Sequence, residues 1–321
     1  MDVTALGEIL IDFSPAGSSP QGNRLFEQNA GGAPANVLAA LSRFGRKTAL
    51  IGKVGEDGFG HYLRSVLVDN SIDVRGLMMI PEASTTLAFV HLGENGERSF
   101  SFVRNPGADQ LLSAKDIKEV GDLLIGQSSV FHFGSLSLTH EPARSATWAA
   151  LKCARGHGIK VSYDPNLREA LWPGLEEAKR LILEGMRFAD IVKLSVEELE
   201  FLTGTSNLEQ GSRQLAEEYG LSVVLVTLGA EGSFCRRGGD TCLVEGITVK
   251  AVDTTGAGDA FLGGWLHAYL EANKPETELS LDELRNMLRF ANITGALTTT
   301  RKGAIPALPA LETVLELYKE T

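Results

Sequence analysis

The sequence predicts an α/β fold with a mostly parallel central sheet and a small β-sheet lid. Short apolar, β-branched runs alternate with segments of helical periodicity along nearly the whole chain, which is typical of βαβ units. One region instead alternates apolar and polar residues on both sides of an Asn-Gly pair, which is typical of an antiparallel hairpin. We therefore expect a single α/β domain over residues 1–321, with the hairpin beside its main sheet.

The first quarter of the chain predicts two strands and two helices in alternation. The run VTALGEILI, residues 3–11, predicts the first strand, and Asp12 stands at its end. PANVLAALSRF, residues 34–44, predicts a helix that begins at a proline. TALIGKV, residues 48–54, predicts the next strand, and residues 59–69 have helical spacing.

Two insertions are expected to form the lid, at about residues 13–32 and 84–108. The second contains LAFVHL, GENGE and RSFSFV, which predict a hairpin that turns at Asn95-Gly96. The first is rich in Gly, Ser and Pro and can return over the same face. We expect a homodimer to form through two such lids.

The second half of the chain predicts the central strands of the sheet. SSVFHF, IKVSYD, DIVKL and VVLVTL are strongly apolar, as expected for strands that are buried on both faces. Each is followed by a stretch that can form a helix. They occupy residues 128–133, 159–164, 190–194 and 223–228.

Composition excludes several classes of function. The chain has 43% hydrophobic residues and a formal net charge of −11, and it has no basic run, so we expect no nucleic-acid partner. No stretch approaches the length of a membrane span, and the N-terminus lacks the features of a signal peptide, so we expect a cytoplasmic protein with no membrane partner. The three cysteines have neither disulfide nor zinc-ligand spacing, and the six histidines lie in no recognisable motif.

The stretch that carries the chemistry is VDTTGAGDAF, residues 252–261. Apolar residues recur at helical spacing after it, so its glycines are expected at a helix N-terminus, where free N–H groups bind anions. Asp259 at that position could accept a proton from a hydroxyl that attacks a phosphoryl group. The alternative is that Asp259 only caps the helix.

The whole string resembles the signature of the ribokinase-like, or pfkB, carbohydrate kinase family, and the resemblance covers essentially the whole chain. It implies a three-layer α/β/α sandwich with a small β-sheet lid, and it implies ATP and Mg²⁺ as cofactors. In that family the aspartate that matches Asp259 is the general base. The residues that match Gly256, Ala257 and Gly258 form the anion hole.

The resemblance also implies a sugar site near the N-terminus. GGAPAN looks like the family's sugar-binding glycine pair and asparagine, although its spacing alone favours a simple turn. By analogy Phe100 from the lid would cover the sugar, and two arginines would reach its hydroxyls or the transferred phosphate. The implied sugar-binding residues are Asp12, Gly31, Gly32, Asn36, Phe100, Arg104 and Arg168.

The nucleotide site is implied by short matches in the second half. The turn after VVLV matches the family's nucleotide-contacting turn, and a position near the C-terminus matches one that lines the adenine. Glu198 matches the glutamate that helps hold Mg²⁺ through water, but Ser195 replaces the asparagine of that motif. The implied nucleotide-binding residues are Lys193, Glu198, Thr227, Gly229, Gly232 and Asn292.

A monovalent cation site, for K⁺, is implied beside the anion hole. A hard cation takes oxygen ligands, here mostly backbone carbonyls, and would order the neighbouring loop. The residues implied are Asp253, Thr255, Thr298, Arg301 and Gly303.

The resemblance is greatest to the fructokinases, in GEILIDF, RSFSFVRNPGAD and SYDPNLREALWP. The expected reaction is phosphorylation of the 6-hydroxyl of D-fructose. A 2-keto-3-deoxygluconate kinase or a ribokinase would use the same scaffold, and a non-catalytic sugar or nucleotide sensor is the alternative from another class. An NAD-dependent dehydrogenase is disfavoured because the first strand does not lead into a GxGxxG turn, and a P-loop kinase because GxxxxGK[ST] does not occur.

Overall fold

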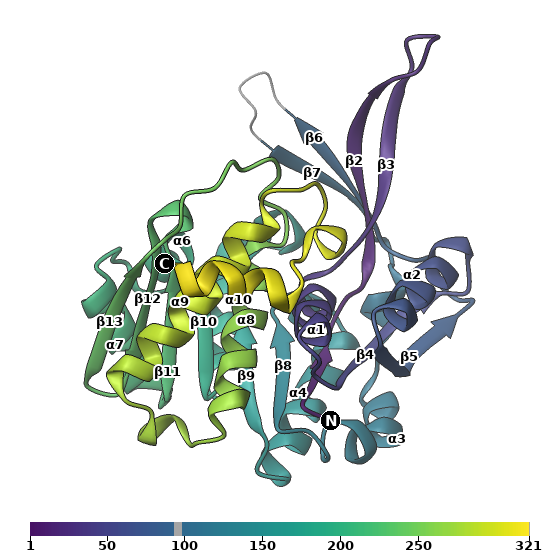
Figure 1. Ribbon diagram of the computed structural model, residues 1–321. Helices are drawn as coiled ribbons and strands as arrows, with labels where there is room; N and C mark the ends of the chain where they lie inside the picture. The colour runs from purple at the N-terminus through teal and green to yellow at the C-terminus, as the bar shows by residue number, and fades with distance from the viewer. Residues whose placement is uncertain (93–97, 321) are drawn as a thin grey trace.

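A computed structural model describes residues 1–92 and 98–320, and it confirms a mixed α/β fold with a large, mostly parallel sheet (Figure 1). Within that range the sheet has nine strands in the order β13-β12-β11-β10-β9-β8-β1-β4-β5. Their bounds are β1 (Val3–Leu6), β4 (Thr48–Gly55), β5 (Ile72–Ile80), β8 (Val130–Gly134), β9 (Lys160–Asp164), β10 (Ile191–Ser195), β11 (Val223–Thr227), β12 (Gly232–Arg237) and β13 (Asp240–Glu245).

Helices cover both faces of the sheet. The helices α1 (Ala33–Arg43), α2 (Gly58–Asp69), α8 (Ala257–Ala272) and α9 (Leu281–Thr298) pack on the near face in Figure 1, with α10 (Leu311–Glu320) against α9. The other face carries α3 (Ala114–Leu124), α4 (Ala143–Gly156), α5 (Leu175–Met186), α6 (Val196–Thr203) and α7 (Leu208–Tyr219). Along β11, Val223 and Leu225 join the first core and Val224 and Val226 the second, as the twofold period of a strand requires.

The lid is a second, four-stranded sheet with the strand order β3-β2-β6-β7. Its strands are β2 (Leu10–Ser18), β3 (Arg24–Gly31), β6 (Leu87–Leu92) and β7 (Arg98–Val103). The two hairpins are antiparallel, and β2 pairs with β6 in parallel, so segments far apart in the sequence join in one sheet. The predicted turn at Asn95-Gly96 lies outside the described residues.

The predicted first strand is divided in two at Gly7. β1 ends at Leu6, and β2 begins at Leu10 in the lid, so Asp12 lies in the lid sheet and not at the end of a central strand. A Cβ at Gly7 would lie 2.6 Å from the Pro34 ring, so only glycine allows the start of α1 to pack against this break. The glycine thus permits the chain to pass from one sheet to the other.

In the described chain a short 3-10 turn, Gly229–Glu231, follows β11 in place of the α-helix expected from sequence. The chain instead forms β12, antiparallel to β11, and β13, antiparallel to β12. Left-handed φ values of 60° at Gly229 and 117° at Gly232 turn the chain back, and Gly238-Gly239 closes the hairpin. The signal was present in the sequence, since two alternating segments flank that glycine pair.

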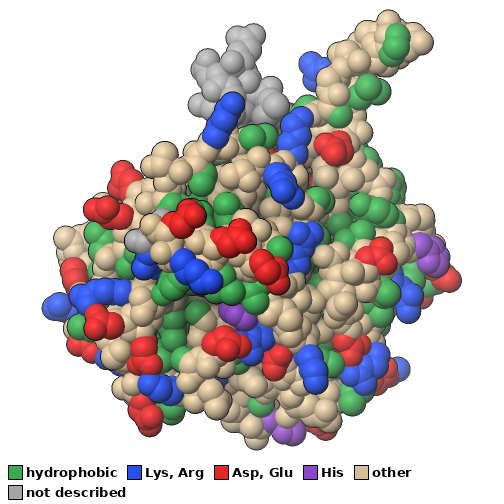
Figure 2. Space-filling model, in the orientation of Figure 1, with side chains coloured by type: hydrophobic (Ala, Val, Ile, Leu, Met, Phe, Trp, Pro, Cys, Tyr) green, Lys and Arg blue, Asp and Glu red, His purple; other side chains and the backbone are tan. Residues whose placement is uncertain are grey.

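The described helices include none that is long and apolar enough to cross a membrane. Acidic and basic side chains are interspersed over the face shown in Figure 2, and the paired strands of the lid project beyond it.

Candidate active site

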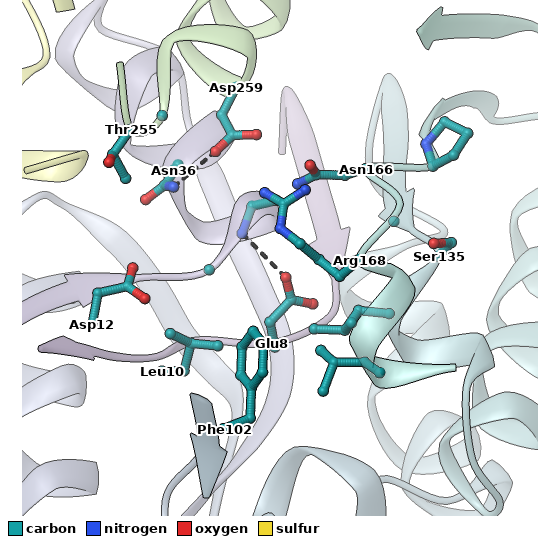
Figure 3. A pocket seen from close by; sticks show the side chains of 17 residues that line it. Glu8, Leu10, Asp12, Asn36, Phe102, Ser135, Asn166, Arg168, Thr255 and Asp259 are labelled. Atoms are coloured by element: carbon teal, nitrogen blue, oxygen red, sulfur yellow. Dashed lines mark hydrogen bonds between the residues drawn. The ribbon is translucent and has the colours of Figure 1, made fainter. Parts of the chain in front are cut away.

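A pocket opens beneath the lid at the carboxyl ends of β1, β8 and β9 (Figure 3). Ligands gather at this edge of parallel sheets, because loops and helix N-termini meet there. The lid contributes Asp12 and Phe102, and the start of α8 contributes Asp259. The lining consists of Glu8, Leu10, Asp12, Gly32, Ala33, Asn36, Phe102, Gly134, Ser135, Leu136, Pro165, Asn166, Arg168, Leu171, Thr255, Gly256 and Asp259.

A second, more apolar pocket lies on the other side of the α8 N-terminus. Its volume is about 360 Å³, against about 100 Å³ for the first. Ala257 and Gly258 line the second pocket, whereas Gly256 and Asp259 line the first. The first turn of α8 therefore stands between the two cavities, with its free backbone N–H groups at their junction.

Asp259 is buried, and its Oδ2 accepts a hydrogen bond from Asn36 Nδ2 at 2.8 Å. Burial raises the pKa of Asp259 to about 6, and the neighbouring Asp164 acts in the same direction. The hydrogen bond from Asn36 and the charges of Lys193 and Arg168 partly offset this increase. The carboxylate is thus held in one orientation, with a proton affinity suited to a general base near neutral pH.

Two glycines at the N-terminus of α8 stand where a larger side chain would clash with its neighbours. Gly256 has a left-handed φ of 77°, and a Cβ there would lie 2.8 Å from Ala304 Cβ. A Cβ at Gly258 would lie 2.9 Å from Lys193 Nζ. The two glycines therefore let this turn pack closely against Ala304 and Lys193, and the anion hole expected at Gly256, Ala257 and Gly258 stays a prediction.

Lys193 lies beneath this turn and is not a surface residue. Its Nζ forms a buried ion pair with Asp164 Oδ2 at 3.0 Å. Burial disfavours the charged ammonium, but Asp164, Glu198 and Asp259 outweigh it and raise the pKa of Lys193. The second oxygen of Asp164, Oδ1, is buried and has no hydrogen-bond partner in the described part of the chain.

Glu198 lies next to this pair and does not face solvent. Its Oε1 accepts from Leu167 N at 2.7 Å and its Oε2 from Ser195 N at 2.8 Å, while Ser195 Oγ caps the start of α6. Burial, followed by repulsion from Asp164, raises the pKa of Glu198. The serine that replaces the family's asparagine therefore completes a reciprocal capping box.

The predicted sugar-binding residues near the N-terminus come together in the first pocket. A Cβ at Gly31, which does not itself line the pocket, would lie 2.1 Å from Asp12 Oδ2, and one at Gly32 would lie 2.5 Å from the backbone carbonyl oxygen of Glu8, so the glycine pair makes room for the Asp12 carboxylate and for the Glu8 backbone. Burial raises the pKa of Asp12 to about 6 despite the charge of Arg168. Figure 3 shows the Arg168 side chain between the acids and Asn166.

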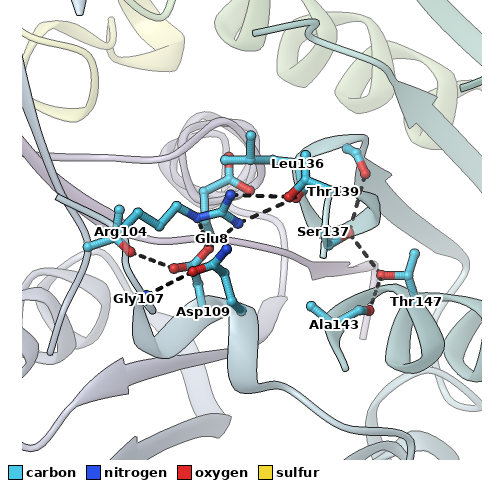
Figure 4. A network of polar contacts seen from close by, with 12 residues as sticks. Glu8, Arg104, Gly107, Asp109, Leu136, Ser137, Thr139, Ala143 and Thr147 are labelled. Atoms are coloured by element: carbon cyan, nitrogen blue, oxygen red, sulfur yellow. Dashed lines mark hydrogen bonds and ion pairs between the residues drawn. The ribbon is translucent and has the colours of Figure 1, made fainter. Parts of the chain in front are cut away.

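Arg104, also predicted as a sugar ligand, does not line this pocket. Its guanidinium is buried and pairs with Asp109 Oδ2 at 2.6 Å, and it donates to Thr139 Oγ1 at 3.2 Å. Figure 4 shows it between Glu8, Asp109 and Thr139. Because this ion pair engages its guanidinium, Arg104 supports the wall of the pocket and does not extend into it. The side chain of Phe100 lies outside the described residues, and Phe102 occupies the lid position over the pocket.

Glu8 is a site residue that the sequence reasoning missed. It is buried, and its Oε1 accepts from Ala33 N at 3.1 Å. Burial raises the pKa of Glu8 to about 7, and Asp109 adds to the increase while Arg104 opposes it. Its position two residues after β1 was the available signal, and Ser135, Asp164 and Asn166 follow or end strands in the same way.

The predicted nucleotide turn lines the second pocket with Thr227, Gly229 and Gly232. Asn292 lies there too, but its amide donates to the carbonyl oxygens of Val244, at 3.1 Å, and Glu245, at 3.2 Å. It therefore braces the strand edge that forms the pocket wall.

The segments predicted to surround a monovalent cation also meet. Asp253 Oδ2 accepts from Gly303 N at 3.1 Å, and its Oδ1 accepts from Thr255 N at 2.9 Å. Thr298 is buried at the end of α9, where its hydroxyl donates to Thr294 O at 2.9 Å, while Arg301 is exposed. The loop before α8 is thus tied to the loop after α9.

Comparison with known proteins gives a consistent picture. Residues 1–311 match the model of the pfkB family carbohydrate kinases. The chain is 46% identical over 309 residues to probable fructokinase-2 of Arabidopsis thaliana, covering 96% of this chain and 92% of that protein. It resembles a crystal structure of Xylella fastidiosa fructokinase with bound ATP at a TM-score of 0.90 and 34% identity, over 99% and 98% of the two chains. For the fructose-, ADP- and calcium-bound fructokinase of Vibrio cholerae O395 the TM-score is 0.87 and the identity 36%, over 98% of each chain.

Proposed function

This chain belongs to the pfkB family of carbohydrate kinases and is an ATP-dependent carbohydrate kinase, and we propose that it phosphorylates the 6-hydroxyl of D-fructose with Asp259 as the general base. The observation that carries the proposal is the position of the α8 N-terminus. It separates a small pocket, which three acidic side chains line, from a larger and more apolar one, and it presents Asp259 to the smaller pocket. A sugar bound in the smaller pocket and ATP bound in the larger one would therefore meet at that turn.

In the proposed reaction the sugar lies in the first pocket and ATP in the second. The Asp259 carboxylate, oriented by Asn36, takes the proton of the attacking hydroxyl. The backbone N–H groups at Gly256 to Asp259 stabilise the negative charge on the transferred phosphoryl group. Arg168, which reaches into the first pocket, adds a positive charge there.

The acidic pair beside the junction fits a hydrated Mg²⁺ ion. Asp164 Oδ1 is buried without a donor, and Glu198 lies close enough for their charges to raise the pKa of the latter. Bound there with ATP, Mg²⁺ would neutralise phosphate charge. We further propose that the loops around Asp253 and Gly303 hold K⁺ through backbone carbonyl groups, because oxygen ligands suit such an ion.

Fructose is favoured over 2-keto-3-deoxygluconate by the charges of the pocket. The keto acid carries a carboxylate, which two arginines were expected to bind. Arg104 is committed to Asp109, so only Arg168 remains in the pocket. Asp12 and Asp259, whose pKa values are about 6, also line it and would repel an anionic sugar at neutral pH, whereas carboxyl oxygens, including those of Glu8, accept hydrogen bonds from a neutral polyol.

The test is ADP release by purified protein with MgATP and D-fructose, 2-keto-3-deoxygluconate, D-ribose or no sugar. We expect turnover that requires fructose and increases with K⁺. Turnover with the keto acid alone would replace the proposed substrate but leave the kinase assignment intact. The absence of any sugar-dependent release of ADP would contradict the proposal and favour a nucleotide or sugar sensor.

The pH profile provides a separate prediction. Because the pKa of Asp259 is raised to about 6, the base is protonated and inactive below that pH. We expect kcat/KM for fructose to decrease as the pH decreases through about 6, and because Glu8 in the same pocket has a pKa raised to about 7, the decrease can begin near pH 7. Asp12 has a raised pKa of about 6 as well, so the decrease can be steeper than one proton would give. A profile that stays level to pH 5 would contradict the assigned base.

The remaining parts of the proposal concern the closure of the lid, the homodimer and the location of the protein in the cell. Phe102 over the pocket is suited to excluding water when the lid closes on the sugar. Pairing of two lids in a homodimer stays a prediction, as does a cytoplasmic location, which the three free thiols favour.

A further inference from the structure

Three side chains that commonly bind metal ions converge on the surface where α3 meets α4. They are Asp122 from α3, Cys153 from α4, and His157 at the end of α4. One carboxylate oxygen, the thiol sulfur and one imidazole nitrogen all lie within 4.8 Å of one another. His157 Nε2 is 2.9 Å from Asp122 Oδ1, and Cys153 Sγ is 3.8 Å from the same oxygen.

Helix geometry accounts for this convergence. Cys153 and His157 are four residues apart, so they lie on one face of α4, one turn from each other. The packing of α3 against α4 places Asp122 opposite that face. The sequence did not predict this cluster because its cysteines and its histidines were considered separately. The third side chain, Asp122, comes from another helix.

Two glycines form the floor of the cluster. A Cβ at Gly121 would lie 3.2 Å from Cys153 Sγ. A Cβ at Gly126 would lie 3.0 Å from His157 Nε2 and 2.8 Å from the carbonyl oxygen of Asp122. Gly121 lies inside α3, where glycine costs about 1 kcal/mol relative to alanine. The space that it leaves accommodates the thiol.

We propose that Asp122, Cys153 and His157 bind one Zn²⁺ ion, with water as the fourth ligand. A sulfur, nitrogen and oxygen donor set suits zinc and not Mg²⁺ or Ca²⁺, which prefer oxygen alone. The three donor atoms need only small side-chain rotations to reach bonding distances of about 2.0–2.3 Å from a common centre. On binding, the thiol loses its proton to solvent and the thiolate becomes a ligand.

The zinc site would be separate from catalysis. α3 and α4 each end shortly before a strand begins, at Val130 and Lys160, so the cluster lies at the amino edge of the sheet, opposite the active site. Figure 1 shows α3 at the end of the molecule away from the lid. The expected consequence is that the metal ties the ends of two surface helices together and stabilises the fold through mass action.

The experiment is a titration of the metal-free full-length protein with Co²⁺ and with Zn²⁺, in excess Mg²⁺ to occupy the active site. Wild-type protein should bind one Co²⁺ per chain and develop thiolate-to-cobalt charge-transfer absorption, which Zn²⁺ should abolish by displacement. Zn²⁺ should also raise its melting temperature. In Cys153→Ser the absorption should vanish although Cys235 and Cys242 remain, and His157→Ala should bind more than about tenfold more weakly.

Matched controls are His61→Ala and Asp69→Asn, which remove an exposed histidine and an exposed aspartate from α2. Both should bind like the wild type. All variants should retain sugar-dependent turnover, which verifies folding independently of the metal. Absence of the charge-transfer band in wild-type protein would overturn the proposal and leave an ordinary surface ion pair, and so would equal affinities of the wild type and both cluster variants.

Discussion

Replacing Asp259 by asparagine is expected to lower kcat by about two to four orders of magnitude, the usual span for loss of a positioned general base. The amide has nearly the same shape as the carboxylate and can still pair with Asn36, but it cannot accept the proton of the sugar hydroxyl. ATP binding should be nearly unchanged, because the backbone of the α8 turn remains. The measurement is sugar-dependent ADP release at saturating fructose and MgATP.

The control for this variant is Asp282→Asn, which removes an exposed aspartate from the first turn of α9. Asp282 is the second residue of α9 and Asp259 is the third residue of α8, so both lie in the first turn of a helix, but Asp282 lies away from both pockets. If Asp259 only capped its helix, both variants would lose a little stability and neither would lose activity. Near-normal turnover by correctly folded Asp259→Asn would therefore eliminate the assigned base.

Lys193→Met is expected to decrease the free energy of unfolding by about 3–5 kcal/mol, because it leaves a buried carboxylate without its cation. The side chains of Lys193 and Asp164 are only 7% and 2% exposed, so solvent cannot replace the lost partner. Asp259 and Glu198, whose charges also act on Lys193, would lose the same compensation. The shift of the urea midpoint, converted with the measured slope, gives the change.

Two further variants test this interpretation. Lys115→Met removes an exposed lysine of α3 and should change stability by less than about 0.5 kcal/mol. The double variant Lys193→Met, Asp164→Leu removes both charges and should recover much of the loss. If Lys193→Met changed the stability as little as Lys115→Met, Lys193 would be an ordinary lysine at a strand end and would not be required to compensate the charge of Asp164.

Much of the architecture could be predicted because its signals are local. Runs such as VVLVTL and IKVSYD show burial on both faces, and the periodic residues after Asp259 indicate the helix whose start bears the chemistry. The same holds for the second lid hairpin. The break at Gly7 was missed because its glycine signal depends on the packing of Pro34 nearby, whereas the β12–β13 hairpin was missed although alternating segments flank Gly238-Gly239 in the sequence.

Three properties of this chain therefore follow from its sequence alone: the α/β class with a lid, the helix that begins at the turn Gly256 to Asp259, and the family resemblance. Only the tertiary structure decided that Arg104 pairs with Asp109, that Glu8 enters the pocket, and that Asp122 meets Cys153 and His157. Backbone periodicity and capping depend on residues a few positions apart, and they are visible in one dimension. Ion pairs and ligand clusters join residues from separate elements, so their partners are determined only when helices and strands pack.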